Sequence, residues 1–97
     1  MELDDQFYNR ADAHINLSNE QMKEAGLVKV NDSMMYSVVR FNAWVSASGF
    51  DSGEEMAAAR EEIIEYFSTQ YRMMLEENLD NYIANFDKFM GMSKESN

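Results

Sequence analysis

No proline occurs in the 97 residues of this chain, and its four glycines stand at positions 26, 49, 53 and 91. Proline breaks a helix because it lacks a backbone N–H group and its ring clashes with the preceding turn. A chain without proline can form long helices, and its glycines then mark places where helices end. We therefore expect an all-α fold, a small bundle of three helices over about residues 4–25, 32–48 and 53–89.

The first expected helix has a single apolar stripe. Six residues fall within roughly 80° of a helical wheel: Phe7, Ala11, Ile15, Ser18, Met22 and Ala25. Asp4 or Asp5 would cap the start of this helix, and Gly26 would stop it. Residues 27–30 would then form a short extended connector to the next helix.

The second expected helix is apolar over an unusually wide arc. Asn31, Asp32 or Ser33 would cap its start. About 160° of its wheel is occupied by one set of residues: Met34, Met35, Val38, Val39, Phe41, Asn42 and Val45. A helix of this kind needs contacts on more than one side, so we expect it to be the central helix.

The third expected helix opens with the capping box Ser52-Gly53-Glu54-Glu55 and continues to about Phe89. Such a helix would be roughly 54 Å long, which is uncommon in a compact domain. The centre of its apolar face also turns by roughly 90° between residues 56–74 and residues 75–90. Either the helix breaks near residues 78–81, or its end packs on a different partner. We favour a break there, because Asn78, Asp80 and Asn81 are residues that can cap a new helix.

The length of the chain allows one domain at most. We expect a single helical domain over residues 1–90, followed by a frayed tail over residues 91–97. No apolar run approaches the roughly 20 residues that span a bilayer. The acidic N-terminus also lacks the parts of a signal peptide. These features indicate a cytoplasmic protein.

The residues that carry most enzyme chemistry are scarce. Cysteine is absent and His14 is the sole histidine, so thiol nucleophiles and sites with two histidine ligands are excluded. The scattered glycines form no phosphate-binding loop. We interpret His14 as a half-buried structural residue. Glu61 and Glu65 lie one turn apart on the third expected helix, and we interpret them as a solvated helix face rather than a cation site. The sequence therefore predicts no enzyme, no cofactor and no metal.

The net charge of −10 comes from 18 acidic and 8 basic residues. A surface of this kind repels nucleic acids and anionic membranes and attracts basic proteins. One function to consider is therefore an acidic decoy that binds a basic protein or mimics nucleic acid. The row of carboxylates that would serve it is interrupted by Arg72 and consists of Glu54, Glu61, Glu65 and Glu76.

A surface for protein contacts is the hypothesis we favour. The narrow polar sector of the second helix and its border hold three residues at single-turn intervals: Tyr36, Arg40 and Trp44. Tyrosine, arginine and tryptophan are enriched at interface hot spots. The alternative is that Arg40 pairs with a carboxylate and Trp44 lies in the core. Tyr66 and Met73 belong to a second apolar stripe on the third helix. Three helices of one chain cannot easily cover so much apolar surface, so we expect a homodimer.

Two stretches of the sequence resemble a known family. These are Arg40-Phe41-Asn42-Ala43-Trp44 and the run from Glu65-Tyr66-Phe67 through Gln70-Tyr71-Arg72 to Glu77-Asn78-Leu79-Asp80. They are similar to short acidic proteobacterial proteins grouped as domain of unknown function 3144. The likeness extends from about Phe7 to Phe86, and Trp44 stands where the family often has Phe. The resemblance implies a bacterial cytosolic protein and brings no activity, cofactor or catalytic residue.

Overall fold

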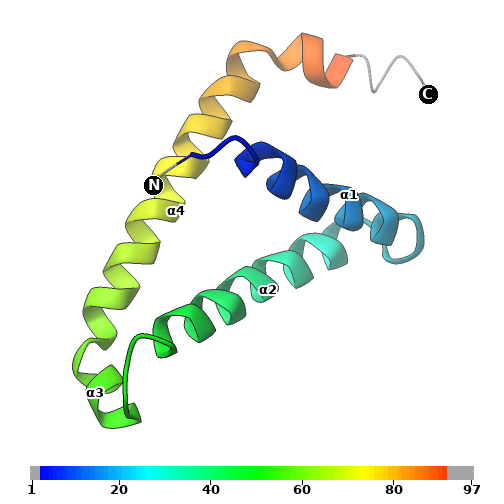
Figure 1. Cartoon of the computed structure of the whole chain (residues 1–97). Helices are drawn as coiled ribbons and strands as arrows, with labels where there is room; N and C mark the ends of the chain where they lie inside the picture. The colour runs from blue at the N-terminus through cyan, green and yellow to red at the C-terminus, as the bar shows by residue number, and fades with distance from the viewer. Residues whose placement is uncertain (1–2, 92–97) are drawn as a thin grey trace. The chain divides into compact units, whose positions relative to one another are not determined.

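Every regular element in the computed structural model, which describes residues 3–91, is a helix. Four α-helices and one π-helix follow one another along the chain (Figure 1): α1 (Phe7–Ala25), α2 (Leu27–Ala47), α3 (Gly53–Ala58), α4 (Arg60–Ala84) and η1 (Asp87–Gly91). The predicted all-α class is confirmed, with three long helices, whereas a bundle of three helices is not.

The chain divides into two compact units, Met1–Gly49 and Phe50–Asn97. The single domain expected over residues 1–90 stays a prediction. Of the expected frayed tail, Gly91 is the last residue of η1, and residues 92–97 lie outside the described part of the chain.

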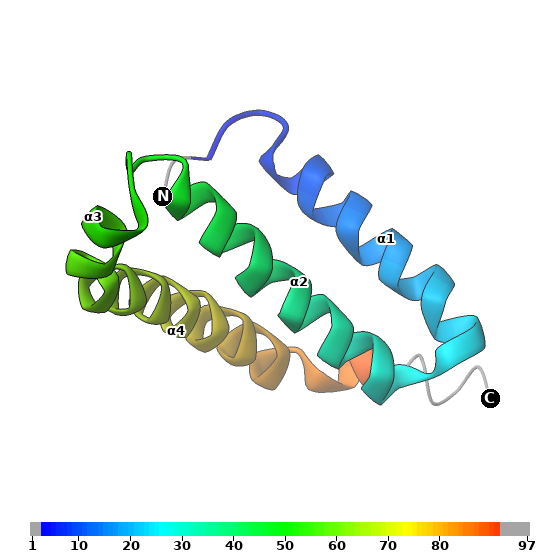
Figure 2. The same ribbon diagram turned by 90° about the horizontal axis from the view of Figure 1, so that it is seen from below.

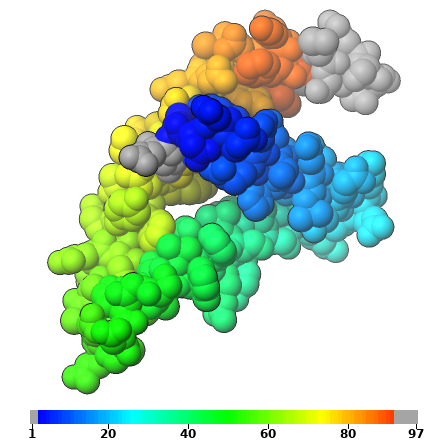
Figure 3. All heavy atoms as spheres, in the orientation of Figure 1, coloured from blue at the N-terminus to red at the C-terminus, as the bar shows by residue number. Residues whose placement is uncertain are grey.

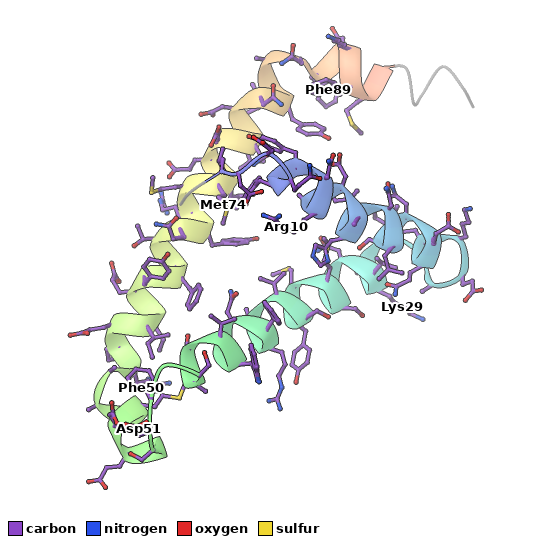
Figure 4. All side chains as sticks on the ribbon, viewed as in Figure 1. Arg10, Lys29, Phe50, Asp51, Met74 and Phe89 are labelled. Atoms are coloured by element: carbon purple, nitrogen blue, oxygen red, sulfur yellow. The ribbon has the colours of Figure 1, made fainter. Side chains whose placement is uncertain are left out.

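Helix α1 begins three residues later than expected. Asp4 organises a turn ahead of the helix instead of capping it. Its Oδ1 accepts a hydrogen bond from the backbone N–H of Gln6 at 2.8 Å, and its carbonyl oxygen accepts one from Phe7 at 3.1 Å. Its Oδ2 accepts a hydrogen bond from Nη2 of Arg10, a residue on the first turns of α1 (Figure 4), at 2.7 Å. The acidic residue therefore acts one turn before the helix.

A single residue separates α1 from α2, so the expected connector over residues 27–30 is wrong. Gly26 has φ +86° and ψ 167°, a backbone conformation open essentially only to glycine. It reverses the chain, and Leu27 already belongs to α2. The N–H of Val30 donates to the Gly26 carbonyl at 3.3 Å, which makes residues 27–30 the first helical turn. Sequence reasoning missed this start because the cap residues at 31–33 fitted a later one equally well.

The two helices of this first unit run antiparallel (Figure 2) and diverge away from the turn (Figure 1). Their side chains meet near the turn (Figure 3), where Val30 is 5% exposed and is the one buried residue among those described. Ser18 Oγ donates to Met34 Sδ at 3.4 Å across the helix pair. The predicted stripe on α1 is half-buried at Phe7, Ala11, Ser18 and Met22, while Ile15 is exposed.

The second unit opens with the predicted cap. Ser52 Oγ accepts a hydrogen bond from the backbone N–H of Glu55 at 3.1 Å. Glu55 reaches back as well, although its Oε2 accepts from the N–H of Asp51 at 3.3 Å rather than from that of Ser52. The expected start at residue 53 is therefore confirmed. Helix α3 is short, however, because Ala59 leaves helical geometry at φ −100° and ψ 5° before α4 begins.

Helix α4 is continuous through residues 78–81, so the break expected there is wrong. The reason lies in the hydrogen bonds of the asparagines. Asn78 Nδ2 donates to the carbonyl of Met74 at 2.7 Å, one turn back within the same helix, and so caps nothing. The chain leaves α-helical geometry at Asn85 instead, and η1 follows. The ring of Phe89 on η1 (Figure 4) then lies 4.9 Å from the ring of Tyr82.

Candidate functional site

All five residues predicted for an interaction surface are exposed. Tyr36 and Trp44 are 65% and 66% exposed, and Arg40 between them is exposed as well. These three residues lie on α2 in the first unit. Tyr66 and Met73, at 57% and 59%, lie on α4 in the second unit. The structure therefore brings the α2 residues together on one element of the first unit, and the α4 residues on one element of the second.

The α2 residues belong to a longer row, because α2 begins earlier than predicted. Val28 and Asp32 precede Tyr36 at the same four-residue spacing, and residues at this spacing form one ridge along a helix. We call Val28, Asp32, Tyr36, Arg40 and Trp44 the α2 ridge. All five side chains are exposed, Val28 by 71%. Sequence reasoning missed Val28 and Asp32, which it had assigned to a connector and a cap. The four-residue spacing was the available signal, but it required the helix to start at Gly26.

The charged residues of the α2 ridge are Asp32 and Arg40. Within residues 3–91, neither Asp32 nor Arg40 takes part in an ion pair. The Trp44 ring stacks on Phe41 at 6.0 Å between centroids, with 22° between the planes. This pair presents two aromatic side chains beside an unpaired guanidinium, which is a combination that protein interfaces favour.

Helix α2 differs in charge from the rest of the chain. Lys29, Asp32 and Arg40 are its charged residues, so the helix is net positive by one in a chain of net charge −10. Lys29 lies next to the turn between α1 and α2 (Figure 4). Other large apolar residues of α2 are also exposed: Met35, Val38, Val39, Phe41 and Val45. Helix α2 thus offers an apolar surface with little negative charge.

Helix α4 offers a second apolar surface, with a more acidic border. Its exposed apolar side chains include Tyr71, Leu75, Leu79 and Tyr82, in addition to the predicted pair. The acidic row considered above is divided by Ala59, since Glu54 belongs to α3 and the other three carboxylates to α4.

Several carboxylates of that row already have partners. Glu61 pairs with Arg60, and Glu76 pairs with Arg72 at 3.5 Å. Glu65 accepts a hydrogen bond from Thr69 Oγ1 at 3.4 Å. The row is therefore less negative, and less continuous, than its sequence suggests.

The described residues gather few reactive groups. In residues 3–91 no three side chains of His, Cys, Asp or Glu come together as a metal site would require. His14 is exposed, so its interpretation as a half-buried residue is wrong. The pKa of Asp4 lies below its ordinary value, because the Arg10 guanidinium and then the Gln6 backbone N–H stabilise the carboxylate. No helix in this part of the chain combines the length and the apolar character that crossing a bilayer demands.

These features define a small all-helical protein with exposed apolar helix faces. The chain belongs to the family described as protein of unknown function (DUF3144), whose model matches residues 7–83. This agrees with the resemblance seen in the sequence. Among solved structures, the chain is similar to the NMR structure of the protein NB7890A from Shewanella sp., with 32% sequence identity and a TM-score of 0.74. The likeness covers 95% of this chain and 98% of the Shewanella chain. A comparison with curated proteins found no match.

Proposed function

We propose that the protein is a non-catalytic, cytoplasmic helical interaction module that pairs with a second copy of itself. The observation that carries the proposal is the exposure of large apolar side chains along α2 and α4, while Val30 is the one buried residue among those described. Soluble monomers rarely expose continuous apolar patches of more than a few hundred Å². Each Å² of apolar surface removed from water contributes about 25 cal/mol, which favours association.

The small size of the first unit also favours a covering partner. The fraction of surface that a domain buries falls with its size, so a helical hairpin of this length is marginal alone, and isolated helices are marginal in water. A second copy is favoured over a basic partner because α2 is the least acidic helix of the chain. Two copies that meet through α2 bring few carboxylates together, although each has a net charge of −10.

The proposal is tested by light scattering coupled to size exclusion, over a dilution series from high micromolar concentration. The expected mass at high concentration is twice the 11.3 kDa of the chain. Tyr36→Ala should shift the protein toward the monomer, and Tyr8→Ala is the matched control. Tyr8 is also a tyrosine of the first unit and is 66% exposed, against 65% for Tyr36, but it lies on α1. A clean monomer at the highest concentration contradicts the proposal.

The absence of chemistry is a separate part of the proposal and has its own test. Elemental analysis of the purified protein should find no stoichiometric metal. A thermal-shift screen of divalent cations should likewise leave the melting temperature unchanged. A bound metal, or a stabilisation that saturates at one ion per chain, contradicts a non-catalytic role without cofactors.

A further inference from the structure

The α2 ridge is chemically complementary to its own reverse. Its sequence of side chains is apolar at Val28, acidic at Asp32, aromatic at Tyr36, basic at Arg40 and apolar at Trp44. Tyr36 is the middle of the row, which is about 24 Å long at 1.5 Å per residue. A row of this kind is complementary to itself when a second copy runs in the opposite direction.

The chemistry of the row distinguishes between the two ways of pairing it. In a parallel pair, Asp32 would face Asp32 of the other copy and Arg40 would face Arg40. In an antiparallel pair centred on Tyr36, each Asp32 faces the other copy's Arg40, and each Val28 faces Trp44. A two-fold axis through Tyr36 produces this arrangement, and two-fold symmetry is the commonest symmetry of homodimers.

Helix geometry allows the two ridges to run alongside each other. Residues spaced by four form ridges inclined at about 26° to the helix axis, and two such ridges align when the helices cross at about 50°. This is the commonest class of helix packing in globular proteins. Asp32 and Arg40 are available for it because both are exposed and neither is in an ion pair within the described residues.

We infer that two copies of the chain dock through antiparallel α2 ridges centred on Tyr36, with Asp32 of each copy paired to Arg40 of the other. This inference rests on the proposed function and specifies the surface, direction and register of the dimer.

Charge reversal tests the register. Asp32→Arg leaves arginines at positions 32 and 40, and Arg40→Asp leaves aspartates at both. We expect each variant alone to dimerise at least about tenfold more weakly than the unmodified chain, since both reciprocal pairs become repulsive. An equimolar mixture should form a heterodimer with both pairs attractive, and its dissociation constant should return to within about threefold of the original. Sedimentation equilibrium measures the constants, and native mass spectrometry counts the species.

Net charge alone gives the opposite expectation for one of these variants. Asp32→Arg replaces one negative charge by one positive charge, so the net charge changes from −10 to −8. The repulsion between copies therefore decreases. The matched control is Asp12→Arg, which makes the same change at an exposed aspartate of α1 that has no ion-pair partner within residues 3–91. The control should dimerise as well as the unmodified chain or better, whereas Asp32→Arg should dimerise worse.

A covalent probe tests the axis independently. Since the chain has no cysteine, Tyr36→Cys introduces the only thiol. Two such thiols on a two-fold axis lie close enough for a disulfide, which needs Cα atoms about 4.4–6.8 Å apart. Mild oxidation should therefore link Tyr36→Cys into a dimer rapidly, and should link Tyr8→Cys at least about tenfold more slowly.

The possible outcomes separate this inference from the proposed function. A dimer whose stability ignores both charge reversals, and whose mixture shows no heterodimer preference, overturns the α2 ridge pairing and leaves self-association standing. Equal rates of disulfide cross-linking for Tyr36→Cys and Tyr8→Cys likewise overturn the α2 ridge pairing and leave self-association standing. A monomeric unmodified chain overturns both. A stable heterodimer formed from two weakened variants supports both.

Discussion

Gly26 carries the tightest backbone requirement in the described chain. Its φ of +86° is positive, and it is the one residue between Phe7 and Ala47 that lies outside α1 and α2. Open space surrounds the position, since apart from Gly26 itself and its two neighbours in the chain no atom lies within 4 Å of where a Cβ would be. Replacing it therefore tests backbone strain without a steric clash.

We expect Gly26→Ala to lower the free energy of unfolding by about 1–3 kcal/mol, because alanine resists this backbone conformation. Gly53→Ala is the control, since Gly53 is the first residue of α3, also has open space and needs no positive φ. The control should be neutral or stabilising by up to about 1 kcal/mol. Urea unfolding of both variants measures the difference, and equal stabilities would contradict the role given to Gly26.

The turn before α1 depends on the charge of Asp4. The folded state lowers the pKa of this carboxyl, so the ion pair with Arg10 stabilises the turn at neutral pH. That stabilisation is lost as the pH falls through the lowered pKa, when the folded state must also take up a proton. Arg10→Gln should raise the pKa of Asp4 toward its ordinary value, and Arg10→Lys should raise it less. Carboxyl chemical shifts followed by NMR titration give the pKa, and an unchanged value in Arg10→Gln would refute the assignment.

At the scale of the elements, an aromatic side-chain contact joins helix α4 to η1. The rings of Tyr82 and Phe89 are seven residues apart and 4.9 Å from each other. The N–H of Phe89 also donates to the carbonyl of Asn85 at 3.0 Å. An aromatic pair contributes about 0.5–1.5 kcal/mol beyond its buried area, enough to stabilise one short π-helical turn locally.

Phe89→Ala should therefore increase amide hydrogen exchange across residues 87–91 by about two- to tenfold, as expected from the loss of one aromatic pair. Met90→Ala is the control, because Met90 lies on the same turn and no ring contact involves it. Residues 60–75 of α4 should exchange as before in both variants. Unchanged exchange in Phe89→Ala would mean that the ring contact does not hold η1.

Local signals in the sequence predicted some elements and missed others for identifiable reasons. The α3 start was predictable because the side chains of Ser52 and Glu55 accept hydrogen bonds from backbone N–H groups only a few residues away. The α2 start was missed because Asp32 is as good a cap residue as a helix-face residue. The α4 break was misplaced because Asn78 satisfies its amide within the helix. At the candidate site, residue type suggested Tyr36, Arg40 and Trp44 as an interaction surface but left open a core position for Trp44, and the structure exposes all three. Val28 and Asp32 could be added only with the correct helix start.

At the scale of the whole molecule, the charge of −10 opposes pairing of two copies. Ten charges on each copy, about 20 Å apart in water, repel by roughly 20 kcal/mol without salt. Most of this repulsion disappears at about 0.15 M salt, where the Debye length is about 8 Å. An exposed ion pair contributes only about 0.2–1 kcal/mol, so screening of the repulsion outweighs weakening of the Asp32–Arg40 pairs.

We therefore expect the dimer to become tighter as sodium chloride rises from about 20 mM to 150 mM, in contrast to associations driven by opposite charges. Sedimentation equilibrium at several salt concentrations checks the direction. The decoy hypothesis makes the opposite prediction for its complex with a basic protein, since that complex would dissociate in salt. A dimer that weakens monotonically with salt would contradict association through α2.

The small core has a calorimetric consequence. Unfolding a typical domain of this length raises the heat capacity by about 1.2–1.5 kcal/mol/K, mostly because apolar groups become hydrated. A lone copy in which Val30, at 5% exposure, is the one buried residue among those described hides little apolar surface to hydrate. Its heat-capacity increment, and its sensitivity to urea, should fall well below those values. A heat-capacity increment that grows with protein concentration would then measure the apolar surface that two copies bury between them.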